Sequence, residues 1–191
     1  AVFELTTPFR AKSSSLVGFW SKVRCVDDDI AEVMARNRYS SALDNTLFEP
    51  HAQDEIILCL KYDGLYGINN INRFLQSNNP NPATRWGVYT YKVNDPVLFY
   101  ESERFRPVIY NNLKGWIRGI DRRPGQIQFT VELDRVLSEF DVIGNELEWI
   151  DGSTVRFSVY EVDSSDDDDD LFNTVVPFQV AYAVSIHKAQ G

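Results

Sequence analysis

The last residues of the chain change abruptly from apolar to polar. Val180–Val184 is typical of an apolar strand interrupted only by Tyr182, and Ser185, His187 and a final Gly191 follow it. Open α/β sheets place ligand-contacting groups at the carboxyl ends of their strands, so this ending predicts a binding edge. A hydroxyl and an imidazole at such an edge are able to reach one nucleic-acid phosphate. The alternative interpretation is a buried strand with a hydrogen-bonded core histidine.

A second apolar run predicts a neighbouring strand of the same sheet. Glu55–Leu60 is almost continuously apolar, as expected of a parallel strand that is covered on both faces. It leads through Lys61–Gly64 into a helical stretch that holds Ile68 and Ile71. This strand-turn-helix order indicates an α/β scaffold. Lys61, at the carboxyl end of the run, is a candidate contact for a DNA backbone, although a polar surface explains it almost as well.

Between these runs the pattern changes to short strands separated by turn residues. We expect strands near residues 88–92, 96–100, 115–120, 127–133, 146–150 and 155–162. Short strands at this spacing favour a small β-barrel inserted into the scaffold. The α/β domain is therefore expected over residues 1–86 and 174–191, and the barrel with an acidic loop over residues 87–173. Near the start, one helix is expected to open at Lys12–Ser15 and another to cover Asp28–Arg38.

The distribution of charge matters more than its sum. A formal net charge of −9 argues against a simple nucleic-acid binder, whose domain is usually basic. The acidic run Asp166–Asp170 accounts for part of this charge, and it lacks the spacing of a calcium loop, so we interpret it as a solvated loop. Between residues 104 and 123 a basic stripe stands against the single acid Asp121; its members are Arg104, Arg106, Lys114, Arg118, Arg122 and Arg123.

Aromatic residues are interleaved with this stripe. Phe105, Tyr110 and Trp116 lie between its basic residues. Basic groups follow phosphates while aromatic faces stack on bases, and each stacked base contributes about 1–3 kcal/mol. The alternative is that the aromatic residues fill a small barrel core, and for Trp116 the two interpretations are equal. The candidate nucleic-acid contacts from this segment are Arg104, Arg106, Lys114, Trp116 and Arg118.

The residues from Ala181 to Gly191 closely resemble motif V of superfamily 1 DNA helicases, in the form carried by RecD-like and Dda-like members. The resemblance implies that Ser185 and His187 contact the DNA strand. It also implies that Gln190 and Gly191 lie toward the ATP. Because motif V lies within a domain in that family, the chain is expected to be a segment of a longer protein.

The start of the chain resembles motif IV of the same helicases, in segments 4–10 and 16–24. There an arginine after the first strand reaches the γ-phosphate of ATP, and Arg10 matches that position. A guanidinium suits this role because it is permanently charged and presents a planar fork to phosphate oxygens. Such an arginine contributes roughly 10³–10⁵-fold to turnover in phosphoryl-transfer enzymes. The alternative is a surface arginine in an ordinary turn.

Two further segments extend the resemblance. Residues 93–99 and 110–118 resemble the SH3-like insertion of these helicases, and Asn69, Asn70 and Asn72 resemble a helix that follows one of their strands. The resemblance implies that the chain is the second RecA-like motor domain of such a helicase, also called the UvrD-like C-terminal region. Its fold class is α/β, with a RecA-like parallel sheet that has helices on both faces and is interrupted by a small SH3-like β-barrel.

The sequence lacks the parts that bind nucleotide in such a motor. It has no Gly-x-x-x-x-Gly-Lys-Ser/Thr phosphate loop, and Asp54–Glu55 precedes its apolar run instead of ending it. The chain alone is therefore not expected to bind ATP or Mg²⁺ or to hydrolyse ATP. The resemblance assigns ATP and Mg²⁺ to a parent protein with a first RecA-like domain, and single-stranded DNA is the expected partner.

The remaining expectations concern location and alternatives. No apolar run approaches the roughly 20 residues of a membrane span, so no membrane partner is expected. Cys25 and Cys59 do not suit a metal or disulfide framework, so no metal site is expected. Two free thiols are typical of a reducing compartment, so a cytoplasmic location is expected. Two other functional classes stay open. One is a non-catalytic nucleic-acid-binding module, and the other is an interaction scaffold whose acidic loop faces a basic partner.

Overall fold

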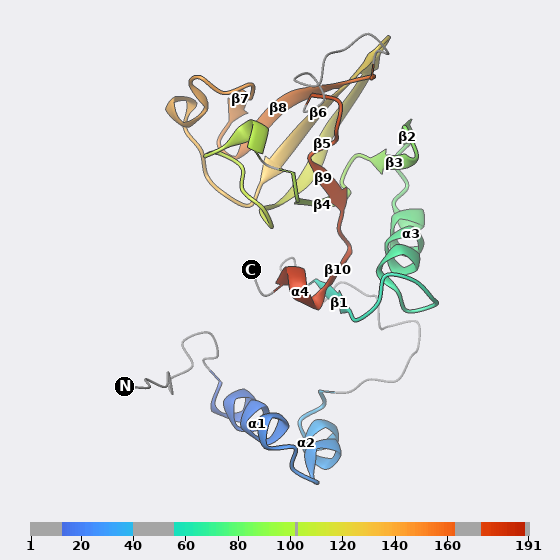
Figure 1. Ribbon diagram of the computed structural model, residues 1–191, viewed down its shortest axis with the longest axis vertical. Coiled ribbons are helices and arrows are strands. Elements are labelled where there is room, and N and C mark those ends of the chain that lie inside the picture. The colour runs from blue at the N-terminus through green and yellow to red at the C-terminus, as the bar shows by residue number, and fades with distance from the viewer. Residues whose placement is uncertain (1–12, 40–55, 102, 163–172, 190–191) are drawn as a thin grey trace. The chain divides into compact units, whose positions relative to one another are not determined.

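The computed structural model describes residues 13–39, 56–101, 103–162 and 173–189 (Figure 1). The chain forms two compact units, residues 1–51 and 52–191. The first unit contains helices α1 (Ser14–Cys25) and α2 (Ile30–Arg36). Both helices expected near the start of the chain are confirmed, the second in a shorter form.

Local contacts define the ends of these two helices. The Ser13 hydroxyl accepts a hydrogen bond from the Leu16 amide and so caps the start of α1. Val26 ends α1 in the left-handed conformation, with φ 56°. The Lys22 ammonium lies 2.7 Å from a carboxylate oxygen of Asp29, at the start of α2. Because these are exposed or half-buried contacts, they fix local geometry more than stability.

The second unit contains the parallel strand pair that the sequence predicts. Strand β1 (Ile57–Cys59) pairs in parallel with β10 (Ala183–Ser185). Helix α3 (Ile68–Asn78) follows β1, and the short helix α4 (Ile186–Ala189) follows β10 directly. The strand-turn-helix unit after residue 55 is therefore confirmed.

A six-stranded antiparallel sheet makes up most of this unit, in the order β7-β8-β6-β5-β4-β9. A separate hairpin of β2 and β3 precedes it. The strands are β2 (Ala83–Trp86), β3 (Tyr89–Lys92), β4 (Pro96–Phe99), β5 (Lys114–Arg123), β6 (Gln126–Leu133), β7 (Glu148–Asp151), β8 (Thr154–Tyr160) and β9 (Phe178–Val180). The six short strands expected between residues 87 and 162 are confirmed. Strand β2 was not predicted from the sequence. Two short 3-10 helices, η1 (Glu103–Phe105) and η2 (Glu139–Val142), lie in the connections.

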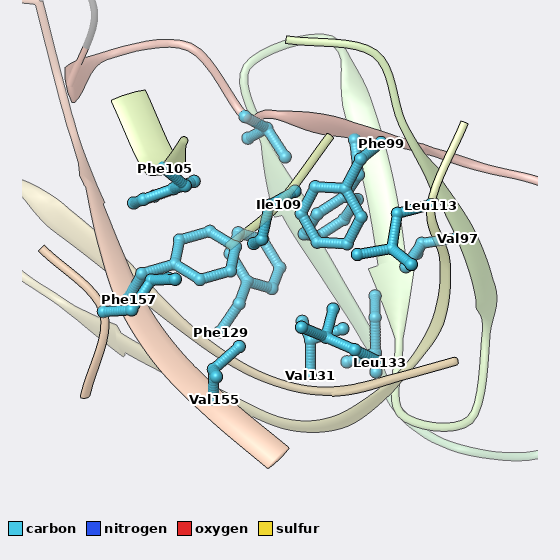
Figure 2. Packing of buried hydrophobic residues seen from close by; sticks show 14 of the residues in the cluster. Val97, Phe99, Phe105, Ile109, Leu113, Phe129, Val131, Leu133, Val155 and Phe157 are labelled. Atoms are coloured by element: carbon cyan, nitrogen blue, oxygen red, sulfur yellow. The ribbon is translucent and has the colours of Figure 1, made fainter. Parts of the chain in front are cut away.

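One face of the large sheet carries the main hydrophobic core. Strand β6 alternates strictly, so that Ile127, Phe129, Val131 and Leu133 are buried while the residues between them are half-buried. The rings of Phe105, Phe129 and Phe157 gather on one side of this core (Figure 2). Because alternate residues point to opposite faces, the other face of β6 is polar.

The apolar run Val180–Val184, expected to form one strand, is instead divided between two strands. Strand β9 pairs with β4 in the large sheet, and β10 pairs with β1. Two hydrogen bonds to residues far away in the sequence mark the break. The Ala181 amide donates to the Pro96 carbonyl at 2.8 Å, at the end of the β4–β9 ladder, and Tyr182 then directs its hydroxyl to Asp95. One segment therefore contributes a strand to each sheet.

Within the part of the chain that the structure describes, none of the helices has the length and apolar character needed to cross a membrane.

Candidate nucleic-acid interface

The polar ends of the two parallel strands lie at the same edge. Cys59 pairs with Ser185, and because the strands are parallel their carboxyl ends share that edge. Lys61 follows two residues after Cys59, and His187 follows two residues after Ser185. The structure thus brings together Lys61, Ser185 and His187, which the sequence predicts as strand contacts from segments far apart in the chain.

These three side chains differ in how open they are. Ser185 is only 6% exposed, and its hydroxyl accepts a hydrogen bond from the Lys188 amide at 3.3 Å, in the first turn of α4. His187 and Lys61 are both exposed. His187 is therefore not the buried core histidine of the alternative interpretation. Its imidazole and the Lys61 ammonium are two side-chain groups at this edge that face solvent.

Asparagines of α3 hold the edge in place. The Asn72 side chain donates to the Ala183 carbonyl at 3.1 Å and accepts from the Ala183 amide at 2.8 Å. It therefore pairs with β10 much as a neighbouring strand does. Asn69 donates to the Asp63 carboxylate and Asn70 to the Leu65 carbonyl, both in the turn before α3. These amides have a structural role in ordering the turn and β10.

The parallel pair packs on the outer face of the large sheet. Leu98 on β4 forms a small buried cluster with Ala181 and Val184, and Ile56 packs against it. Leu98 is paired in register with Lys114 on β5 and with a residue of β9, Gln179. Residues directly opposite one another on adjacent strands point to the same face. Lys114 and Gln179 therefore share the face on which β10 packs.

Lys188 links α4 to this face. Its ammonium donates to the Gln179 side-chain oxygen at 3.1 Å and lies 5.5 Å from the centroid of the Tyr100 ring. Burial raises the pKa of Tyr100, so its ring stays neutral beneath the cation. The sequence-based list of contacts omits Lys188. The signal that could have found it is its place in the polar ending, one residue after His187.

Strand β5 presents a row of polar and aromatic side chains beside this point. Lys114, Trp116 and Arg118 point away from the core, whereas Gly115 and Ile117 between them are buried. Trp116 is half-buried opposite Pro96 and Glu132, outside the main core cluster. Of the two interpretations of Trp116, the structure therefore excludes the barrel core.

Two other predicted contacts lie elsewhere. The Arg104 side chain is only 9% exposed; its guanidinium binds Glu146 at 2.6 Å and donates to the Ser158 carbonyl at 2.9 Å. It also covers the ring of Phe105, a core residue. Ser158 belongs to β8, near the opposite end of the sheet order from β9. Arg106 pairs with Glu103 at 2.8 Å. The structure does not bring these two arginines to the β5 row.

Carboxylates offset most of the basic stripe. Five of its six members form ion pairs, namely Arg104–Glu146, Arg106–Glu103, Arg118–Glu132, Arg122–Glu161 and Arg123–Asp121. The excess of positive charge in the sequence is therefore reduced in space, in three of these pairs by acids from other segments. Lys114 is the member with no carboxylate within ion-pair distance among the described residues. It is consequently the member of the stripe whose charge no described carboxylate offsets at close range.

Other expectations fall on residues that the structure does not describe. Arg10, Gln190, Gly191 and the acidic run Asp166–Asp170 lie outside the described residues. Across the described ranges, no group of three or more His, Cys, Asp or Glu side chains is placed to hold a metal ion.

A parallel pair with a polar carboxyl edge, joined to an antiparallel sheet, is a mixed α/β fold, and this fold has counterparts among solved structures. The Pif1 helicase from Bacteroides, solved in complex with ADP-AlF3 and single-stranded DNA, matches with a TM-score of 0.54 at 13% identity. The match covers 98% of this chain and 43% of that one. A Pif1 helicase structure on the unwinding of forked double-stranded DNA by two coordinating helicases matches with a TM-score of 0.50 at 14% identity, covering 98% and 40%.

These similarities show the fold of the chain. The fold is similar to that of Pif1 helicases, and the α/β class expected from the sequence is confirmed. The chain spans about two fifths of the length of the helicases that it matches, 43% and 40%. No protein-family model and no curated protein sequence matches the chain.

Proposed function

We propose that the chain is part of an ATP-dependent superfamily 1 DNA helicase and grips single-stranded DNA at the carboxyl edge of its parallel pair. One observation carries the proposal: Lys61 meets Ser185 and His187, which lie more than 120 residues later in the sequence, at one edge. The helicase-like fold supports it, because a Pif1 helicase of similar fold was solved with single-stranded DNA and a nucleotide analogue.

In this proposal residues 1–86 and 174–191 belong to the second RecA-like motor domain, and residues 87–173 form an SH3-like insertion. The His187 imidazole and the Lys61 ammonium contact phosphates, and the Ser185 hydroxyl reaches the strand near the start of α4. Lys114, Trp116 and Arg118 extend the grip along β5. Arg104 and Arg106 contribute less, because they lie away from the β5 row.

The nucleotide side of the proposal involves a domain outside this chain. Arg10 supplies a guanidinium to the γ-phosphate, and Gln190 and Gly191 lie toward the ATP. ATP and Mg²⁺ are bound by the first RecA-like domain of the parent protein, and this chain alone does not hydrolyse ATP. Closing and opening of the cleft between the two domains then moves the grip along the strand.

Salt-dependent binding of oligothymidine by the 191-residue chain tests the grip. Neutralised phosphates release counterions, so the slope of log affinity against log salt reports the number of contacts, about 0.7 for each phosphate of a single strand. We expect Lys61→Gln to reduce this slope by about 0.7, the value for one phosphate contact. Arg36→Gln removes the same charge from an exposed site on α2 and is expected to leave the slope unchanged. Salt-independent binding, or none, contradicts the proposal.

The runner-up function is a non-catalytic nucleic-acid-binding module, and ATP hydrolysis separates it from the motor. The measurement uses a longer natural protein that contains this chain, with and without single-stranded DNA, as wild type and as Arg10→Ala. Turnover that the strand stimulates and that collapses in Arg10→Ala supports the motor. No stimulated turnover in the wild type supports the module.

A further inference from the structure

Asp95 is a wholly buried carboxylate that accepts four hydrogen bonds. Of the described residues that are buried and polar, it is the one at 0% exposure. One oxygen accepts from the Asn79 side chain at 2.8 Å and from the Tyr182 hydroxyl at 2.9 Å. The other accepts from the Gln76 side chain at 2.6 Å and from the Lys92 amide at 2.8 Å. All four donors are uncharged groups.

These donors come from three different parts of the unit. Gln76 lies in the last turn of α3 and Asn79 directly after it, Lys92 ends β3, and Tyr182 lies between β9 and β10. Asp95 itself precedes β4, and its carbonyl accepts from the Ile117 amide of β5 at 3.0 Å. We refer to Asp95 with its four donors as the Asp95 junction. The junction ties α3, the hairpin, the large sheet and the β9–β10 connection together.

The junction lies directly before the proposed DNA edge. Tyr182 is three residues from Ser185, and the next residue, Ala183, is held on its backbone by Asn72. The β9–β10 connection is thus fixed by a hydroxyl on one side and by an amide pair on the other. Burial raises the pKa of Tyr182, and the adjoining Asp95 carboxylate raises it further, so the phenol remains a donor.

Stability alone does not account for this arrangement. A carboxylate removed from water loses its hydration, and apolar groups of similar volume would fill the same space without that cost. Buried polar networks of this kind are best attested where they select one register from several. Here the elements to be held in register are short: β1 and β10 have three residues each and α4 has four.

We propose that Asp95 and Tyr182 are positioning residues that hold the edge of Lys61, Ser185 and His187 in register with the β5 row of Lys114, Trp116 and Arg118. One strand of nucleic acid then contacts both sets in succession. This inference rests on the proposed function and adds to it the connection between the two halves of the interface. Neither residue touches the strand.

The first test compares a short and a long strand on the full chain. The probes are oligothymidines of about six and about sixteen nucleotides, the latter long enough for an extended single-strand site. Two contact sets held in register raise the affinity for the long strand through effective concentration. We expect the wild type to bind the long strand at least about tenfold more tightly than the short one. Tyr182→Phe is expected to lose most of this ratio and to bind the short strand as the wild type does.

Tyr160→Phe is the matched control, because Tyr160 lies half-exposed on β8 away from the junction. An undiminished ratio in folded Tyr182→Phe overturns the positioning role. Absence of DNA binding by the wild type overturns the proposed function instead, so the two failures are distinguishable.

A second test does not depend on DNA. Amide hydrogen exchange of the free chain is expected to accelerate at residues 183–188 in Tyr182→Phe and to stay unchanged in β6 and β8. Gln76→Met removes a donor from the α3 side of the junction and is expected to give the same local pattern, which covers the case in which Tyr182→Phe does not fold. Uniform acceleration across both sheets, or none at residues 183–188, overturns the inference.

Discussion

The large antiparallel sheet and the small parallel pair are stabilised in different ways. The sheet has its own continuous core, in which Phe129, Val131 and Val155 are fully buried. The parallel pair has three-residue strands, and apolar side chains around it remain open: Leu58 is 49% exposed and Leu60 is 86% exposed. The pair is held by contacts from outside, from Asn72, Leu98 and the Asp95 junction. The proposed DNA edge therefore lies on the part of the unit that depends most on its neighbours.

The largest expected effect compares one residue type in the two regions. Leu133 on β6 is 2% exposed, whereas Leu58 on β1 is 49% exposed. Leu133→Ala is expected to lower the free energy of unfolding by about 2–5 kcal/mol, because it removes buried methyl groups and leaves a cavity. Leu58→Ala is expected to cost less than about 1.5 kcal/mol, because half of its surface already faces water. Urea denaturation of both variants measures the difference. Equal losses would show that the pair has a core as complete as that of the sheet.

The sequence predicted the two regions unequally well. In β6 and β8 the buried residues alternate with polar or less buried ones, and that period specifies strand and core face together. The division of the last apolar segment into β9 and β10 had no such local signal. It depends on the Tyr182 hydroxyl finding Asp95, which is 87 residues away in the sequence. Periodicity within a segment carries no information on a partner at that separation.

In the candidate interface, too, contacts between residues far apart in the sequence could not be predicted. The polar ends of the two apolar runs were visible as patterns, and the parallel pairing places them together. For the stripe between residues 104 and 123, the sequence showed the net charge but not the ion pairs that its members form. Its ion pairs with Glu146, Glu132 and Glu161 join segments that tertiary structure brings together, so a count of charges along the chain overstates the basic surface.

A smaller effect is expected where Asn72 holds β10. Asn72→Ala removes both hydrogen bonds to Ala183. The buried backbone amide and carbonyl of Ala183 are then unpaired, which costs about 1–3 kcal/mol of local stability. Cys59, 6% exposed and paired with Ser185, reports this opening through its reaction with a thiol reagent. Burial raises the pKa of the Cys59 thiol, so it reacts chiefly when the pair opens.

We expect Cys59 in Asn72→Ala to be labelled about tenfold faster than in the unsubstituted protein, which corresponds to about 1.4 kcal/mol. Both proteins carry Cys25→Ser, because Cys25 is exposed and would react first. Asn69→Ala, which removes an exposed amide from the same helix, is the control. Labelling that is unchanged in Asn72→Ala, or equally fast in the control, would show that Asn72 does not hold β10 in place.

The smallest effect appears only in alkali and compares a tyrosine in each region. Tyr91 packs edge-on against Phe129 and Phe178 in the main core, and burial raises its pKa well above the ordinary value near 10. Above about pH 10 the unfolded chain loses this proton while the folded chain keeps it, so stability falls as pH rises, by up to about 1.4 kcal/mol per pH unit. Tyr91→Phe should flatten this fall, measured by urea denaturation between about pH 9 and 11. Tyr182→Phe should flatten it too, because burial and the adjoining Asp95 carboxylate also raise the pKa of Tyr182. An undiminished fall in Tyr91→Phe would show that the main core does not keep this phenol protonated.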